Sequence, residues 1–125
     1  MTIVLNHTIV AVSDKERGAR LLADLLGLAV GRPAGPFTPV RINPDLTLDF
    51  DDRFGARPGH YAFLVDDTTF DATLEYTRKS NLEWGSGPRL VDYQINHLAG
   101  GRGVYVRDPD GIAYEFFTAD PAILH

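Results

Sequence analysis

The chain has 125 residues, 44% of them apolar and 23% charged, a composition that predicts one compact globular domain. Its formal net charge of −5 argues against nucleic acid as a partner, because binding to phosphates needs a basic surface. The absence of cysteine excludes disulfides, thiolate metal sites and a cysteine nucleophile. Any metal ion must therefore be bound by nitrogen and oxygen ligands.

The segment from Met1 to His7 has no basic region followed by an apolar run, so we expect no signal peptide. The longest apolar stretch, residues 21–30, is interrupted by Asp24 and by glycine, and it is too short to span a bilayer. We therefore expect a cytoplasmic protein that does not enter the membrane.

In the first half of the chain, a β-rich run over residues 5–12 leads into a predicted helix. The sequence Ser13-Asp14-Lys15-Glu16 has the form of a capping box, in which Ser13 caps the helix and Glu16 reaches back. Four leucines between residues 21 and 26 then form an apolar stripe at helical spacing, which Gly27 ends. Strands are predicted at about residues 28–32, 38–42 and 46–51.

The second half shows the same pattern. A β-rich run over residues 58–65 leads into a helix that Asp66 or Asp67 would cap and that would end near Asn81. The buried stripe of this helix is predicted to contain Phe70, Leu74 and Thr77. Strands are predicted at about residues 82–85, 103–107 and 112–118, and Asp108-Pro109-Asp110-Gly111 forms a tight turn between the last two.

Two landmarks align the halves: His7 with His60, and Asp14 with Asp67, each 53 residues apart. The repeat predicts an α+β fold of two βαβββ modules, about residues 1–55 and 56–125. Each module would form a curved mixed sheet with a helix on its convex side, and paired modules would enclose a cavity. The sequence leaves open whether the modules pair within one chain or between two.

Strand alternation predicts that one sheet face carries the chemistry. It places His60 beside small Ala62, and Glu115 beside small Ala113, while the bulky aromatic residues take the opposite face. A lone strand histidine is more often structural than a ligand, but matched histidines and a carboxylate favour a metal site made by His7, His60 and Glu115. Two imidazoles and one carboxylate are the facial triad that binds Fe(II), with Mn, Ni or Zn as alternatives.

These residues resemble the vicinal oxygen chelate superfamily, which includes glyoxalase I, bleomycin- and fosfomycin-resistance proteins and extradiol dioxygenases. The resemblance rests on His7, on Gly59-His60, and on Asp108-Pro109-Asp110-Gly111 followed by Glu115. It implies a glyoxalase/bleomycin-resistance/dioxygenase fold around a metal-containing cavity, and a homodimer.

A closer resemblance, to the subgroup typified by the dioxygenase of chartreusin biosynthesis, rests on residues 5–10, 46–52, 95–97 and 100–105. It implies an Fe(II)-dependent dioxygenase of antibiotic biosynthesis, which cleaves and rearranges an aromatic polyketide. The oxygen would be molecular oxygen, or activated oxygen that a flavin partner supplies.

Asp49 departs from the superfamily pattern, in which glyoxalase-like members carry a fourth ligand at this position, usually glutamate. Because aspartate is one methylene shorter, we favour a general base beside the metal over a ligand. The alternative is a solvated member of an acidic run that extends to Asp52.

A segment at residues 88–100 accounts for about 13 extra residues in the second half, and long loops of this kind are often lids or binding loops. We predict His97 as a second proton-handling residue. Tyr93 and Tyr105 are predicted to contact the substrate. For each residue in the loop the alternative is an ordinary surface position.

The sequence leaves two other functions open. A glyoxalase-type isomerase or a thiol transferase would use Ni, Zn or Mn, and the isomerase would need a fourth ligand, for which Asp49 is the candidate. A drug-binding resistance protein of the bleomycin type typically lacks the metal ligands, so His7, His60 and Glu115 together argue against it.

Overall fold

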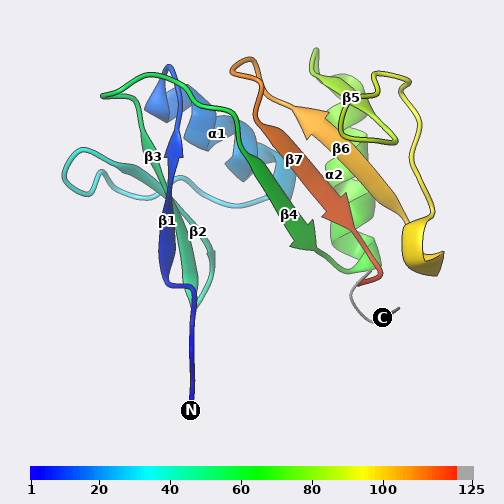
Figure 1. Ribbon diagram of the computed structural model, residues 1–125, viewed down its shortest axis with the longest axis horizontal. Coiled ribbons are helices and arrows are strands. Elements are labelled where there is room, and N and C mark those ends of the chain that lie inside the picture. The colour runs from blue at the N-terminus through cyan, green and yellow to red at the C-terminus, as the bar shows by residue number, and fades with distance from the viewer. Residues whose placement is uncertain (121–125) are drawn as a thin grey trace. The chain divides into compact units, whose positions relative to one another are not determined.

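The computed structural model describes residues 1–120, and the chain divides into two compact units, Met1–Arg57 and Pro58–His125. Each unit combines one mixed sheet with one α-helix, which confirms the predicted α+β class (Figure 1). None of the helices within residues 1–120 has the length and the apolar character that crossing a bilayer requires.

The sheet of the first unit has three strands in the order β1-β3-β2. These strands are β1 (His7–Ala11), β2 (Thr38–Asn43) and β3 (Leu46–Asp51). β1 runs parallel to β3, and β2 runs antiparallel to it. The strand predicted at residues 28–32 is reduced to a single bridge between Val30 and Val40, because Pro33 follows closely and has no N–H to extend the ladder.

Helix α1 (Lys15–Leu26) begins at Asp14, whose carboxylate accepts a hydrogen bond of 3.0 Å from the backbone N–H of Arg17. The prediction that Ser13 caps this helix was therefore wrong, and the Ser13 hydroxyl instead accepts a hydrogen bond from the Arg17 guanidinium. Gly27 ends the helix in the left-handed conformation, with φ of 68°, as predicted.

The sheet of the second unit has four strands in the order β4-β7-β6-β5. These strands are β4 (His60–Leu64), β5 (Glu83–Gly85), β6 (Gly103–Arg107) and β7 (Ala113–Phe117). Helix α2 (Asp67–Lys79) lies across one face of this sheet (Figure 1). The core between them contains four buried residues of α2, including Phe70, and the buried side chains of Val104, Val106, Tyr114 and Phe116.

Asp66 caps α2, since its carboxylate accepts a hydrogen bond of 2.8 Å from the N–H of Thr69. The caps Asp14 and Asp66 are thus 52 residues apart, although the strands that precede them are offset by 53. The predicted match of Asp14 with Asp67 was therefore displaced by one residue, because the connection before α2 is one residue shorter.

Candidate metal-binding site

The sheet of the second unit leaves the face opposite α2 open, and the strand register arranges this face in rows. Residues paired across neighbouring strands point to the same side of a sheet. One row contains Glu83, Arg107, Ala113 and His60. The next row contains Gly85, Tyr105, Glu115 and Ala62. The sequence prediction that His60 and Glu115 share a face with small Ala62 and Ala113 is therefore confirmed.

His60 and Glu115 meet on this face, although 55 residues separate them in the chain. The His60 Nε2 atom lies 2.9 Å from Glu115 Oε1, in hydrogen-bonding geometry. The His60 side chain is 50% exposed and that of Glu115 only 14%, so the carboxylate is largely buried and the imidazole is half exposed. An imidazole nitrogen and a carboxylate oxygen are donors that Fe(II) and related divalent ions accept.

Tyr105 lies beside this pair and is 8% exposed. Its ring centroid is 5.9 Å from that of His60, and its register partner on β7 is Glu115. Burial, followed by the charge of Glu115 and the hydrogen bond that its carboxylate accepts from the phenol, raises the pKa of Tyr105 to about 12. The phenol is therefore a permanent donor at neutral pH, and its hydroxyl is directed to Glu115. Its predicted contact with substrate stays a prediction.

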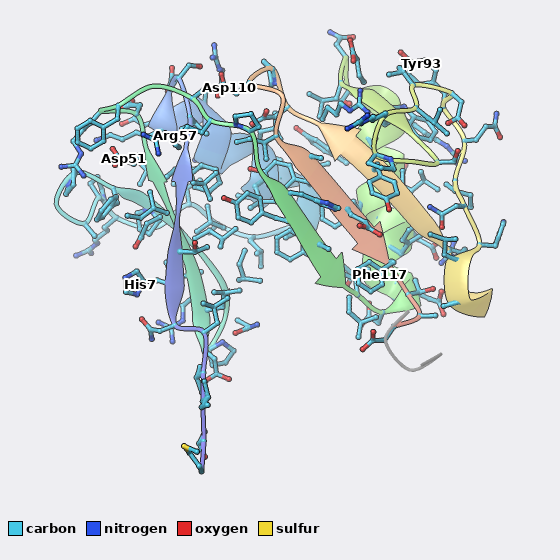
Figure 2. The ribbon with its side chains drawn as sticks, viewed as in Figure 1. His7, Asp51, Arg57, Tyr93, Asp110 and Phe117 are labelled. Carbon is cyan, nitrogen blue, oxygen red and sulfur yellow. The ribbon has the colours of Figure 1, made fainter. Side chains whose placement is uncertain are left out.

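In the first unit, His7 and Asp49 lie on the sheet face opposite to buried Val10 and Phe50. β1 and β3 pair Ile9 with Asp49, as β4 and β7 pair Ala62 with Glu115. Asp49 is therefore the counterpart of Glu115 in its own unit, as the repeat predicted. His7 is exposed at the start of β1 (Figure 2), and its Nδ1 lies 2.9 Å from Asn6 Oδ1.

Within residues 1–120, neither unit by itself gathers three histidine, aspartate or glutamate side chains around one point. The second unit supplies two of the three predicted ligands, His60 and Glu115, in direct contact. Their donor atoms fit a divalent ion that prefers nitrogen and oxygen. His7 belongs to the first unit, and its role as the third ligand stays a prediction.

The register also locates the insertion in the second unit. Trp84 pairs with Val106, whereas their counterparts in the first unit are Val30 and Val40, so the connection is 12 residues longer. The extra residues lie within the loop at residues 86–102, which contains the segment 88–100 predicted from the sequence. A Cβ on Gly85 would lie 2.2 Å from the carbonyl oxygen of Leu90, so only glycine allows the loop to cross β5 this closely.

Hydrogen bonds hold this loop in place. The Asp92 carboxylate accepts bonds from the N–H of Ser86 at 2.8 Å and from its hydroxyl at 2.5 Å. Asn96 exchanges two backbone hydrogen bonds of 2.9 Å with Gly103. Ordered in this way, the loop protects β5, which would otherwise be an open sheet edge.

The two predicted site residues in the loop have structural contacts. Tyr93, at φ of 55°, packs its ring edge-on against Trp84, with 5.5 Å between the ring centroids, and donates its N–H to the Trp84 carbonyl. His97 places Nδ1 3.1 Å from the carbonyl oxygen of Gly101. Neither has a described contact with His60 or Glu115 in the part of the chain that the structure covers, so their chemical roles stay predictions.

Arg107 and Glu83, which share a row with His60, were not among the predicted site residues. The alternation in residues 103–107, where Tyr105 and Arg107 interrupt buried valines, was the available signal. It would have assigned Arg107 to the same face as Tyr105.

Solved structures similar to this chain include two oxidases. Oxidase ChaP-H2 is 46% identical, with 96% of each chain covered and a TM-score of 0.89. Oxidase ChaP-H1 is 43% identical, with 95% of this chain and 98% of that chain covered and a TM-score of 0.86.

The fosfomycin resistance protein FosX from Mesorhizobium loti is 23% identical over 99% of this chain and 98% of its own, with a TM-score of 0.71, and supports the fold alone. Neither a scan against family models nor a search of curated proteins found a match.

Proposed function

The chain belongs to the vicinal oxygen chelate superfamily, close to the ChaP oxidases, and from this membership we propose that it is a non-haem Fe(II)-dependent dioxygenase. We further propose that it oxidatively cleaves or rearranges an aromatic, polyketide-like substrate in antibiotic biosynthesis. The co-substrate would be molecular oxygen, with oxygen activated by a partner flavin as the alternative.

The contact between His60 and Glu115 on the open sheet face is the observation that carries this proposal. It supplies one imidazole and one carboxylate, to which His7 would add the second imidazole. Bound to these three ligands, Fe(II) would supply redox chemistry with dioxygen and leave positions for vicinal oxygens of a substrate.

Neighbouring residues would support metal binding by His60 and Glu115. The phenol of Tyr105 hydrogen-bonds the Glu115 carboxylate, and this second interaction restrains the carboxylate before any ion binds. Asp49 is half-buried on the open face of the first sheet. There it would accept a proton from a phenolic hydroxyl of the substrate.

Metal analysis of anaerobically purified protein tests the proposal. We expect on the order of one iron per chain for wild type and a large loss for His60→Ala and Glu115→Ala, because each removes one of three ligands. His97→Ala is the matched control, since it removes a histidine whose described contact lies within its own loop. Equal iron in wild type and His60→Ala would remove His60 from the site and overturn the proposal.

A second candidate function is a glyoxalase-type isomerase, which the register of Asp49 favours. Asp49 occupies in its sheet the place that Glu115 occupies in the other, so a second carboxylate is available as a fourth ligand. An isomerase does not consume oxygen. Turnover of an aromatic substrate that is equally fast under air and under nitrogen would therefore favour the isomerase and contradict the dioxygenase.

A further inference from the structure

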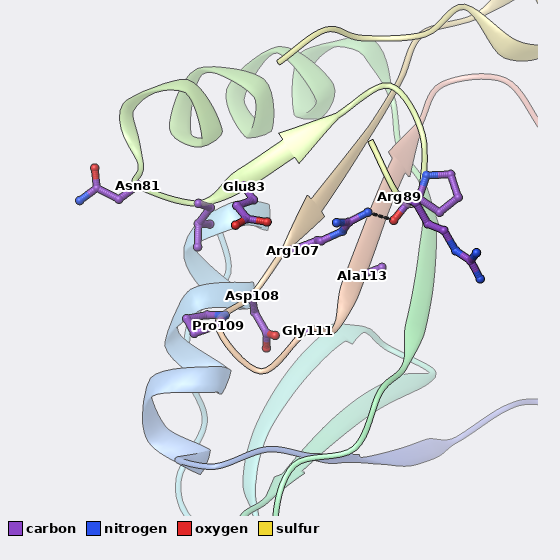
Figure 3. Close-up of a pocket in the computed structure, with 10 residues that line it drawn as sticks. Asn81, Glu83, Arg89, Arg107, Asp108, Pro109, Gly111 and Ala113 are labelled. Carbon is purple, nitrogen blue, oxygen red and sulfur yellow. Dashed lines mark hydrogen bonds between the residues drawn. The ribbon is translucent and has the colours of Figure 1, made fainter. Parts of the chain in front are cut away.

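A cavity of about 660 Å³ lies at one end of the second unit's sheet, where β5 begins and the turn between β6 and β7 lies (Figure 3). Arg107 and Ala113 contribute to it from the open face, and the start of the long loop borders it. Its volume is in the range that binds ligands of two or more rings. None of the residues that line it was predicted from the sequence as a site residue.

The strand register places this cavity next to the candidate metal ligands. Arg107, Ala113 and His60 are consecutive members of one row on adjacent strands. Arg107 is thus two strand spacings from His60, on the order of 10 Å between Cα atoms. Because the residue between them is alanine, a flat molecule that starts at His60 can extend over Ala113 toward Arg107 without meeting a large side chain.

The charged side chains of the cavity differ in how far they are free to bind a ligand. Arg107 donates a hydrogen bond from Nη2 to the carbonyl oxygen of Pro88, which fixes its guanidinium and leaves its other N–H groups available (Figure 3). Arg89 and Glu83 are exposed and have no described hydrogen bond or ion pair within residues 1–120. The cavity lining thus includes two arginines and one exposed carboxylate, that of Glu83, and the Arg89 side chain points away from Glu83 and Arg107 (Figure 3).

The carboxylate of Asp108, the other acidic residue of the cavity, is already hydrogen-bonded within the protein. Its carboxylate accepts hydrogen bonds of 2.9 Å and 2.8 Å from the N–H groups of Asp110 and Ile112. Burial raises the pKa of its carboxyl, against the opposing effect of those hydrogen bonds. It stabilises the turn and is 6% exposed, so it opposes a bound anion less than Glu83 does.

We propose that this cavity is a second substrate subsite, which binds a carboxylate on the aromatic end distant from the metal ligands. The assignment of the occupant as substrate rests on the proposed function. A guanidinium held in place by a backbone carbonyl is suited to a carboxylate, which it can bind through two parallel hydrogen bonds. Leu82 and the rings of Pro88 and Pro109 supply apolar surface for the fused rings.

The test compares 2-naphthoate with its neutral analogue 2-naphthamide in calorimetric titrations of the full chain. Both the wild type and His60→Ala are used, because the variant removes binding of the carboxylate to a metal. We expect 2-naphthoate to bind about tenfold more tightly than the amide in both proteins, since the charged acceptor strengthens its hydrogen bonds to arginine. Equal affinities of the two compounds would overturn the subsite.

Three variants assign the preference to the cavity. Arg107→Gln should abolish most of the preference for 2-naphthoate. Arg89→Gln should weaken the binding of 2-naphthoate by about threefold, as expected for an exposed ion pair. Glu83→Gln should tighten the binding of 2-naphthoate by a similar factor, because it removes a negative charge that repels the carboxylate. Arg78→Gln, on exposed α2 surface, changes the net charge by the same amount as Arg107→Gln and Arg89→Gln and should have no effect on the affinity for 2-naphthoate.

Arg89→Gln and Glu83→Gln alter exposed side chains, so they still test the subsite if Arg107→Gln disturbs the fold of the loop. Unchanged affinities in both would contradict the proposal. If the wild type binds no iron but keeps the carboxylate preference, the proposed function is overturned and the subsite is kept. If the wild type binds iron but shows no carboxylate preference, the subsite alone is overturned.

Discussion

At the scale of single residues, the site depends on how Glu115 is held. The carboxylate has two neighbours, His60 at 2.9 Å and the phenol of Tyr105. Because the pKa of Tyr105 is raised to about 12, its hydroxyl keeps its proton and remains a donor throughout the neutral range. We therefore propose Tyr105 as a positioning residue for Glu115.

Replacing Tyr105 with phenylalanine should weaken iron binding without unfolding the protein. The ring stays in its buried position, while Glu115 loses one hydrogen bond, and loss of such a partner typically costs about tenfold or more in metal affinity. Titration of the metal-free protein with Fe(II) under nitrogen measures the change. Tyr93→Phe is the control, and equal iron affinity in Tyr105→Phe and wild type would show that the phenol does not support Glu115.

At the scale of helices and strands, local rules predicted most of the chain and failed where neighbouring residues compete. The two strands around the Asp-Pro-Asp-Gly turn appear close to their predicted bounds. The cap of α1 lies on Asp14 and not on Ser13, because two adjacent residues were both good caps and their backbone geometry decided between them. Pattern alone cannot distinguish such neighbours.

The cap assignment predicts different stabilities for two adjacent variants. Asp14→Ala removes the acceptor for the Arg17 N–H and should lower the free energy of unfolding by about 1 kcal/mol. Ser13→Ala should lower it by less, since the Ser13 hydroxyl accepts a hydrogen bond from the exposed Arg17 guanidinium and the Arg17 N–H is bonded to Asp14. Urea denaturation followed by circular dichroism measures both. A larger loss for Ser13→Ala would restore the original prediction.

At the scale of the whole molecule, the chain is a duplicated unit in which each copy offers a histidine and a carboxylate from the same strand positions. The copies differ in length between Trp84 and Val106, where the second unit gains its long loop. Two large apolar side chains are exposed on the open faces, Ile9 in the first unit and Leu64 in the second. Exposed apolar surface of this kind is typical of proteins that associate.

We therefore expect the protein to be a homodimer in solution, as the family resemblance also implied. Light scattering coupled to size-exclusion chromatography should give twice the mass of one chain. Ile9→Lys, which places a charge on the open face of the first sheet, should shift the mass toward the monomer if this face is part of the interface. A single-chain mass for wild type at all concentrations would contradict the expectation.

The sequence by itself determined the duplication, the α+β class, the position of the insertion and the faces on which His60 and Glu115 lie. These properties follow from periodicity and turn chemistry, which act over a few residues. The tertiary structure decided that β4 lies beside β7, so that His60 meets Glu115, and that Tyr105 supports them. It also decided that Arg107 and Glu83 share a row with His60, because pairing between distant strands depends on packing of the whole sheet.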